Sequence, residues 1–200
     1  MPTRRGALSM IAMLMLSTSA LAHEVIESPA DDPAAGPRRF MMQDVNGTVV
    51  TDETIAGKFT LLYFGYMGCP DVCPTSLMTI SEVLRGIGDR ADKVIALFVT
   101  VDPDRDTAKA LSEFATNFDP RIVALRGPKE YTDHMVKAFN AKYEFHYADP
   151  NDKTNYTVDH TASIALIGPD GILIKRYPHG VTSADITADL SGIIDGAPAN

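Results

Sequence analysis

Both cysteines of this 200-residue chain lie in one short stretch, and that stretch constrains the fold more than any other feature. Residues 59–64 form an uncharged apolar run that ends at Gly65, which is typical of a buried strand. After the cysteines, apolar residues recur every three or four positions and predict a helix beginning near Thr75; they are Leu77, Ile80, Leu84 and Ile87. We therefore expect Cys69 and Cys73 at a strand-to-helix turn.

A turn of this kind favours reactive sulfur atoms. The first turn of a helix presents unpaired N–H groups and the positive end of the helix dipole, and both stabilise a thiolate. Pro70 stiffens the loop, and Pro74 suits the start of a helix. Cys69 and Cys73 are spaced so that both sulfurs can reach one side, where they can share a ligand or form a disulfide.

The first 22 residues have the pattern of a secretory signal peptide. Arg4 and Arg5 precede an apolar run over residues 7–16, and Ala20-Leu21-Ala22 is a small-residue cleavage site. The run is shorter than the roughly 20 residues that a membrane-spanning helix needs, so we favour a cleaved signal and a periplasmic location over a membrane anchor.

The remaining chain divides into a tether and one domain. Residues 23–39 are rich in Pro, Ala and Asp and have no periodic apolar pattern, which predicts a flexible tether. Residues 40–200 have the length of one ordinary globular domain with a sizeable core.

The charge of the chain argues against nucleic acid as a partner. The sequence holds 18 Lys and Arg and 26 Asp and Glu residues. Residues 1–22 contain two of the basic side chains and no acidic one, so cleavage leaves 16 basic and 26 acidic residues and a net charge near −10. An acidic chain of this kind repels the phosphate backbone.

The rest of the domain alternates strands with helices. Asn46-Gly47 lies between two short runs, residues 40–42 and 48–51, and predicts an N-terminal hairpin. Residues 148–157 are polar and predict a loop. The other expected elements are strands over residues 94–101, 122–125 and 143–147, helices near residues 108–118 and 131–139, a hairpin of residues 161–167 and 172–177, and a helix around residues 186–194.

This order of elements predicts an α/β fold with a central mixed sheet and helices on both faces. Sheets of this type place ligands outside the carboxyl ends of their strands, where we expect the cysteine turn. The motif Asp-Pro-Asp-Arg-Asp-Thr over residues 102–107 follows the next strand. We expect Asp106 or Thr107 to cap the helix beginning near Ala108, in preference to a charged docking rim formed by the motif.

Two cysteines at a strand-to-helix turn admit three interpretations: a redox dithiol, a site for a soft metal, or a structural disulfide. So short a loop gains little stability from a disulfide, because its closure removes little entropy from the unfolded chain. Structural zinc usually takes four protein ligands, whereas two thiolates and one imidazole suit Cu(I). The redox and copper interpretations both remain open from the spacing alone.

A third copper ligand would have to be a histidine. The candidates are His23, His134, His146, His160 and His179. Four have simpler explanations, in the tether, on a helix, within a strand or in a terminal loop. His160 stands apart because it lies where a polar segment meets an apolar strand, beside Asp159, which we expect to orient its ring.

Three ordered motifs, with a supporting turn over residues 168–171, resemble those of the Sco/SenC family of copper proteins. They are Gly-Tyr-Met-Gly-Cys-Pro-Asp-Val-Cys-Pro (residues 65–74), Val-Asp-Pro-Asp-Arg-Asp-Thr (residues 101–107) and Val-Asp-His-Thr (residues 158–161), and the resemblance covers about residues 40–194. It implies a thioredoxin-like fold in which Cys69, Cys73 and His160 bind one copper ion, as Cu(I) or Cu(II) or both.

The resemblance also implies a function. Proteins of this family deliver copper to the CuA centre of cytochrome c oxidase, or prepare its thiols. The expected partners are the CuA-containing subunit and, as a further candidate, another periplasmic copper chaperone. Many family members keep a membrane anchor, from which this chain departs if its leader is cleaved.

We favour a periplasmic copper metallochaperone, a binding protein and not an enzyme. The rival is a thiol-disulfide oxidoreductase that reduces cysteines of an oxidase subunit or another exported protein. Three residues separate the cysteines where thioredoxin-type motifs have two, and residues 154–166 contain no proline of the kind such enzymes place before a strand. A copper or redox sensor would use the same three residues.

Overall fold

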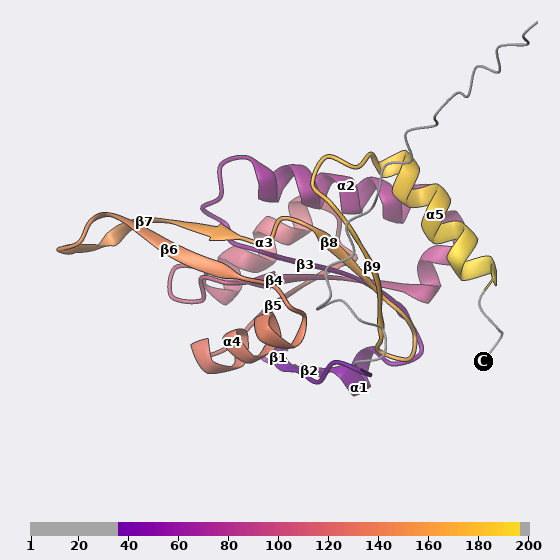
Figure 1. Cartoon of the computed structure of the whole chain (residues 1–200), viewed down its shortest axis with the longest axis horizontal. Helices are drawn as coiled ribbons and strands as arrows, with labels where there is room; N and C mark the ends of the chain where they lie inside the picture. The colour runs from indigo at the N-terminus through magenta and orange to yellow at the C-terminus, as the bar shows by residue number, and fades with distance from the viewer. Residues whose placement is uncertain (1–35, 197–200) are drawn as a thin grey trace, which may run out of the picture.

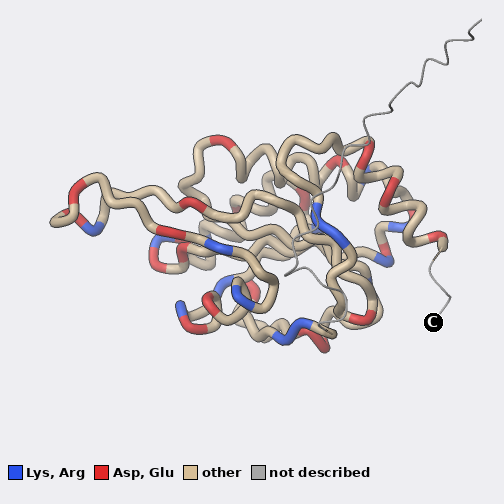
Figure 2. The backbone as a smooth tube through the Cα atoms, in the orientation of Figure 1, with Lys and Arg blue, Asp and Glu red and all other residues tan. Residues whose placement is uncertain are grey.

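The computed structural model describes residues 36–196. The expected signal peptide and most of the expected tether lie outside these residues. Within them, no helix is both long and apolar enough to cross a membrane. Asp and Glu positions are distributed over the described chain with Lys and Arg between them (Figure 2).

A seven-stranded mixed sheet forms the centre of the domain, in the order β2-β1-β5-β4-β3-β8-β9. Its strands are β1 (Met41–Asp44), β2 (Val49–Thr51), β3 (Phe59–Gly65), β4 (Val94–Thr100), β5 (Ile122–Arg126), β8 (Ile164–Ile167) and β9 (Leu173–Tyr177). β3, β4 and β5 are parallel, and the other pairs are antiparallel. The expected N-terminal hairpin, the parallel strands and the hairpin of β8 and β9 are confirmed.

The parallel strands β3 and β4 are the buried centre of the sheet. Every residue of β3 is buried, and its seven residues pair in register with β4, from Phe59 opposite Val94 to Gly65 opposite Thr100. The uncharged composition of both strands explains this position, because a central strand covered on both faces leaves no side open to water. The ends of β3 and β4 therefore lie side by side.

Helices cover both faces of the sheet, as predicted. Figure 1 shows α2 and α5 on one face and α4 on the other. α3 lies with α2, because the Ser81 hydroxyl donates a hydrogen bond to the Phe118 carbonyl at 2.8 Å. The helices are α1 (Asp52–Ile55), α2 (Val72–Gly86), α3 (Ala108–Phe118), α4 (Lys129–Ala138) and α5 (Ser183–Gly196), with a 3-10 helix at Gly88–Lys93.

The predicted loop over residues 148–157 is wrong. Strand β7 (Asp152–His160) pairs with β6 (Tyr143–Asp149) in a separate two-stranded sheet. Figure 1 shows this hairpin extending away from the central sheet. The polar composition of β7 led to the loop prediction. A strand in a hairpin with a solvated face needs apolar residues on one side only.

Two helix starts refine the sequence analysis. α2 begins at Val72, three residues before the expected start near Thr75, and so includes Cys73 in its first turn. α3 begins at Ala108 as expected, and its cap is Thr107, whose hydroxyl accepts a hydrogen bond from the Ala110 N–H at 3.4 Å. Asp106 is therefore not the cap of α3.

We expect Thr107→Ala to lower the free energy of unfolding by about 1 kcal/mol, because the change removes the cap acceptor of α3. The matched control is Thr116→Ala in the same helix, where the hydroxyl only donates back to the Ser112 carbonyl. Urea unfolding of both variants measures the difference. Equal stability of the two variants would contradict a capping role.

Candidate metal centre

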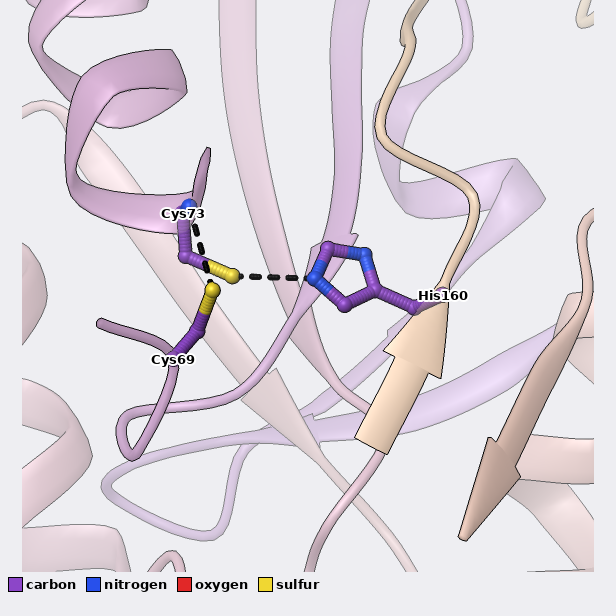
Figure 3. A group of neighbouring side chains, drawn as sticks. All are labelled: Cys69, Cys73 and His160. Atoms are coloured by element: carbon purple, nitrogen blue, oxygen red, sulfur yellow. Dashed lines mark hydrogen bonds between the residues drawn. The ribbon is translucent and has the colours of Figure 1, made fainter. Parts of the chain in front are cut away.

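Three side chains converge where β3, α2 and β7 meet. The sulfurs of Cys69 and Cys73 and a ring nitrogen of His160 all lie within 4.8 Å of one another. Figure 3 shows the two sulfurs and the imidazole pointing toward one another, with Cys69 on the loop, Cys73 at the start of α2 and His160 at the end of β7. In the described part of the chain this is the one cluster of three or more His, Cys, Asp or Glu side chains with metal-binding spacing.

Cys69 lies at the amino end of α2. Its sulfur accepts a hydrogen bond from the Cys73 N–H at 3.4 Å, while the side chain of the capping residue Asp71 makes no such bond. The Cys69 N–H donates to the Tyr66 carbonyl at 3.3 Å, which closes the loop. The sulfur of Cys69 thus takes the place of a capping oxygen for one N–H of the first turn.

Cys73 differs from the expectation of a readily formed thiolate. It is fully buried, and this burial raises the pKa of the Cys73 thiol to about 12. Loss of hydration outweighs the helix dipole here, because a charged sulfur in an apolar site has few compensating donors. In the absence of a metal, Cys73 is therefore a protonated thiol at neutral pH. Cys69 is nearly buried as well, with 9% of its surface exposed.

His160 presents one ring nitrogen to the sulfurs. Its Nε2 lies 3.1 Å from the Cys73 sulfur, and its Nδ1 lies 3.3 Å from the Thr161 carbonyl oxygen. Since a carbonyl oxygen can only accept, a hydrogen bond there requires the proton on Nδ1 and leaves the Nε2 lone pair free. Burial lowers the pKa of His160, so the imidazole is neutral at pH 7.

Two tyrosine rings enclose the imidazole, and the sequence analysis did not identify them. The Tyr63 and Tyr66 rings contact it edge to face, with centroid distances of 5.9 and 6.0 Å. Both belong to the segment from β3 to the cysteine loop. Their position at the carboxyl end of a buried strand could have indicated a place in the site. Packing in the apolar core accounted for two tyrosines at that position equally well.

The expected role of Asp159 is wrong. Its carboxylate is exposed and pairs with Nε2 of His146, 3.0 Å away across the hairpin. Adjacent residues on a strand point to opposite faces, so Asp159 turns away from the site that His160 enters. The Thr161 carbonyl takes the place that we expected for this carboxylate.

The other histidines do not join the cluster. His134 is exposed on α4, and His146 is exposed on β6. His179 is also exposed, and its Nδ1 lies 3.5 Å from the Ser76 hydroxyl. His23 lies outside the described residues.

A surface pocket of about 620 Å³ adjoins the site. Its lining includes Lys142, Tyr143, Glu144, Asp159, His160 and Thr161. Of the three cluster residues only His160 lines this pocket, and Cys73 is fully buried.

The sequence and the fold place the chain in a known family. The SCO1/SenC family matches residues 28–195, and the chain belongs to that family. A SCO2-like protein of Rickettsia prowazekii is 33% identical over 150 residues, which are 74% of this chain and 71% of the relative. The mitochondrial SCO1 homolog of Mus musculus is 34% identical over 155 residues, which are 76% of this chain and 54% of that longer protein.

Solved structures of the family have the same fold. The structure of Bradyrhizobium japonicum ScoI with copper bound is 40% identical, with a TM-score of 0.70 over 78% of this chain and 98% of that one. The structure of Arabidopsis thaliana ScoI with copper bound is 28% identical, with a TM-score of 0.73 over 81% of this chain and 99% of that one. The expected thioredoxin-like fold is thus confirmed.

We expect Gly65→Ala to displace the Cys73 sulfur and to destabilise the domain by about 1–3 kcal/mol. A Cβ at residue 65 would lie 2.8 Å from that sulfur and 3.0 Å from the Phe98 ring. The control is Gly192→Ala in α5, where no atom lies within 4 Å of the added carbon and helix propensity improves. Thermal unfolding of both variants tests this close approach. A Gly65 variant as stable as the wild type would refute it.

Proposed function

We propose that this protein is a copper metallochaperone that holds one copper ion through Cys69, Cys73 and His160. The observation that carries the proposal is the convergence of two sulfurs and one ring nitrogen within 4.8 Å. Thiolate and imidazole are the ligands that soft Cu(I) prefers, and imidazole also suits Cu(II). Membership of the SCO1/SenC family and the copper bound by two structural neighbours support the same metal.

The donor set fits a copper ion better than structural zinc. A closed zinc site takes four protein ligands, and the cluster within residues 36–196 offers three. The neutral His160 offers Nε2 without first losing a proton, whereas Cys73 must lose its thiol proton when the metal enters. Copper binding is therefore coupled to proton release at Cys73.

Three protein ligands leave the ion open to ligand exchange. His160 is only half-buried and lines the surface pocket, while Cys73 would hold the ion from the interior. Thiolates of an acceptor can replace the protein ligands one at a time, so the ion passes without becoming free. Oxidation of Cys69 and Cys73 to a disulfide would remove both sulfur ligands, so copper binding and that oxidation exclude each other.

We propose the assembly of cytochrome c oxidase as the setting of this transfer, with the CuA-containing subunit as acceptor. Family membership supports oxidase assembly, and the two thiolates match a copper centre built from soft ligands. The signal-like pattern of residues 1–22 supports export and a periplasmic site of action.

Removal of any one ligand should weaken copper binding by more than about 100-fold. Loss of a residue that only supports a ligand already costs roughly 10–100-fold. The ligand variants are Cys69→Ser, Cys73→Ser and His160→Ala. His146→Ala and His179→Ala are the matched controls and should bind like the wild type. Anaerobic titration of the reduced protein, followed by mass spectrometry and visible absorption, measures the affinity and the stoichiometry. One copper per chain that persists in any ligand variant would contradict the assignment.

Copper affinity should rise with pH by at least about tenfold per unit between pH 7 and 9, because the ion displaces a proton from Cys73. The pKa of about 12 keeps that thiol protonated throughout this range, and the lowered pKa of His160 keeps the imidazole neutral. Competition with a chelator of known pH dependence measures the slope. A slope near zero would show that no thiol proton is displaced.

A further inference from the structure

We infer that Arg105 is a positioning residue of the metal centre, which fixes strand β7, and with it His160, relative to the cysteine loop. The inference rests on the proposed copper site and adds to it a residue that contacts none of the three ligands in the described hydrogen bonds. Arg105 belongs to the loop between β4 and α3, for which the sequence analysis favoured a helix cap over a charged docking rim.

The guanidinium of Arg105 contacts strand β7 at Tyr156. Its central carbon lies 3.6 Å from the centroid of the Tyr156 ring, a stacked cation–π contact. Its Nη1 donates a hydrogen bond to the Tyr156 carbonyl at 2.9 Å. One side chain therefore contacts both the ring and the backbone of the strand, four residues before His160.

A buried carboxylate holds the guanidinium in place. Asp102, whose side chain is 1% exposed, accepts a hydrogen bond from Nε of Arg105 at 2.5 Å. The Tyr156 hydroxyl donates to the other oxygen of Asp102 at 2.8 Å. Asp102, Arg105 and Tyr156 thus form a closed triangle, in which each residue contacts the other two. A buried carboxylate with two partners is costly to leave unpaired, so the triangle is held firmly.

The same loop also holds the cysteine side of the site. Asp106, next to Arg105, accepts a hydrogen bond from the Met67 N–H at 3.1 Å. Gly68 lies close as well, since a Cβ there would be 4.0 Å from Nη2 of Arg105. Residues 102–106 are therefore a brace between the segment that carries Cys69 and the strand that carries His160.

The hairpin needs such a brace because it lies outside the central sheet. β6 and β7 pair only with each other, and an isolated two-stranded hairpin is marginally stable in water. The Val158 N–H adds a second tie by donating to the Tyr66 hydroxyl at 3.3 Å. Without Arg105, β7 would keep its pairing with β6 and the Val158–Tyr66 hydrogen bond but lose the stacked and backbone contacts at Tyr156.

Arg121 provides a matched control elsewhere in the domain. It pairs with the buried carboxylate of Asp119 through two hydrogen bonds and donates to the Leu84 carbonyl at 2.9 Å. It precedes β5, whereas Arg105 follows β4, so the two arginines lie toward opposite ends of the parallel strands. Loss of either arginine removes one ion pair with a buried carboxylate and one hydrogen bond to a carbonyl.

We expect Arg105→Ala to lower the Cu(II) affinity by up to about 100-fold, the upper end of the range for residues bonded directly to metal ligands. Arg121→Ala should leave the affinity unchanged. The absorption and electron paramagnetic resonance spectra of bound Cu(II) should change in the Arg105 variant alone, because the place of His160 among the ligands changes. Arg105→Lys should not restore the affinity, since lysine lacks the planar fork that stacks and donates at once.

Hydrogen exchange of the reduced, metal-free protein tests the brace without copper. The β6–β7 amides, Val158 among them, should exchange faster in Arg105→Ala and at the wild-type rate in Arg121→Ala, with urea unfolding of both variants reporting global stability.

Equal affinity, spectra and exchange in the two variants would overturn the inference. A wild type that binds no copper would instead refute the proposed function, while exchange would still test the brace. If Arg105→Ala fails to fold, Arg105→Lys, which keeps the charge, takes its place in both measurements.

Discussion

The parallel pairing of β3 with β4 determines where the cysteine loop lies and which loop lies beside it. Their seven registered pairs bring both carboxyl ends to one edge of the sheet, so the cysteine loop after β3 and the acidic loop after β4 leave the sheet as neighbours. The pairing is strong because both strands are buried in the centre of the sheet, where apolar area and backbone hydrogen bonds reinforce each other. His160 reaches the same edge from a strand that is not part of this sheet.

Burial disfavours a thiolate, whereas the amino end of a helix favours one, and the two cysteines differ in how far they are buried. The amino end of α2 favours nearby negative charge, and the Cys73 N–H in its first turn donates to the Cys69 sulfur. Cys73 lies one turn further into an apolar core, and burial there raises the pKa of its thiol to about 12. A metal ion compensates for the lost hydration, because its own charge lies next to the thiolate. At Cys73 the site therefore favours sulfur bound to metal over a free thiolate.

The sequence predicted the parts of the fold that follow from apolar periodicity. Uncharged runs such as residues 59–64 and 94–101 correspond to β3 and β4, and the stripe from Leu77 to Ile87 corresponds to α2. Strand β7 escaped prediction because its solvated residues outnumber its apolar ones, and its identity depends on pairing with β6. The role of Asp159 was misjudged for a related reason, since a strand turns adjacent side chains to opposite faces, whereas a loop does not.

The three candidate ligands were found from residue type and motif order. The contacts of Arg105 and Asp106 could not be found in this way, because they depend on the meeting of distant segments, which spacing along the chain does not encode.

The placement of the third ligand on a marginal element has an energetic consequence. Cys69 and Cys73 belong to the buried centre of the domain, whereas His160 ends a hairpin that is attached through Tyr156 and Val158. An ion bound to all three ligands ties the hairpin to the centre, so part of its binding free energy stabilises the hairpin. The reverse also holds by linkage: any contact that fixes the hairpin raises the affinity for the ion, and any contact that releases it lowers the affinity.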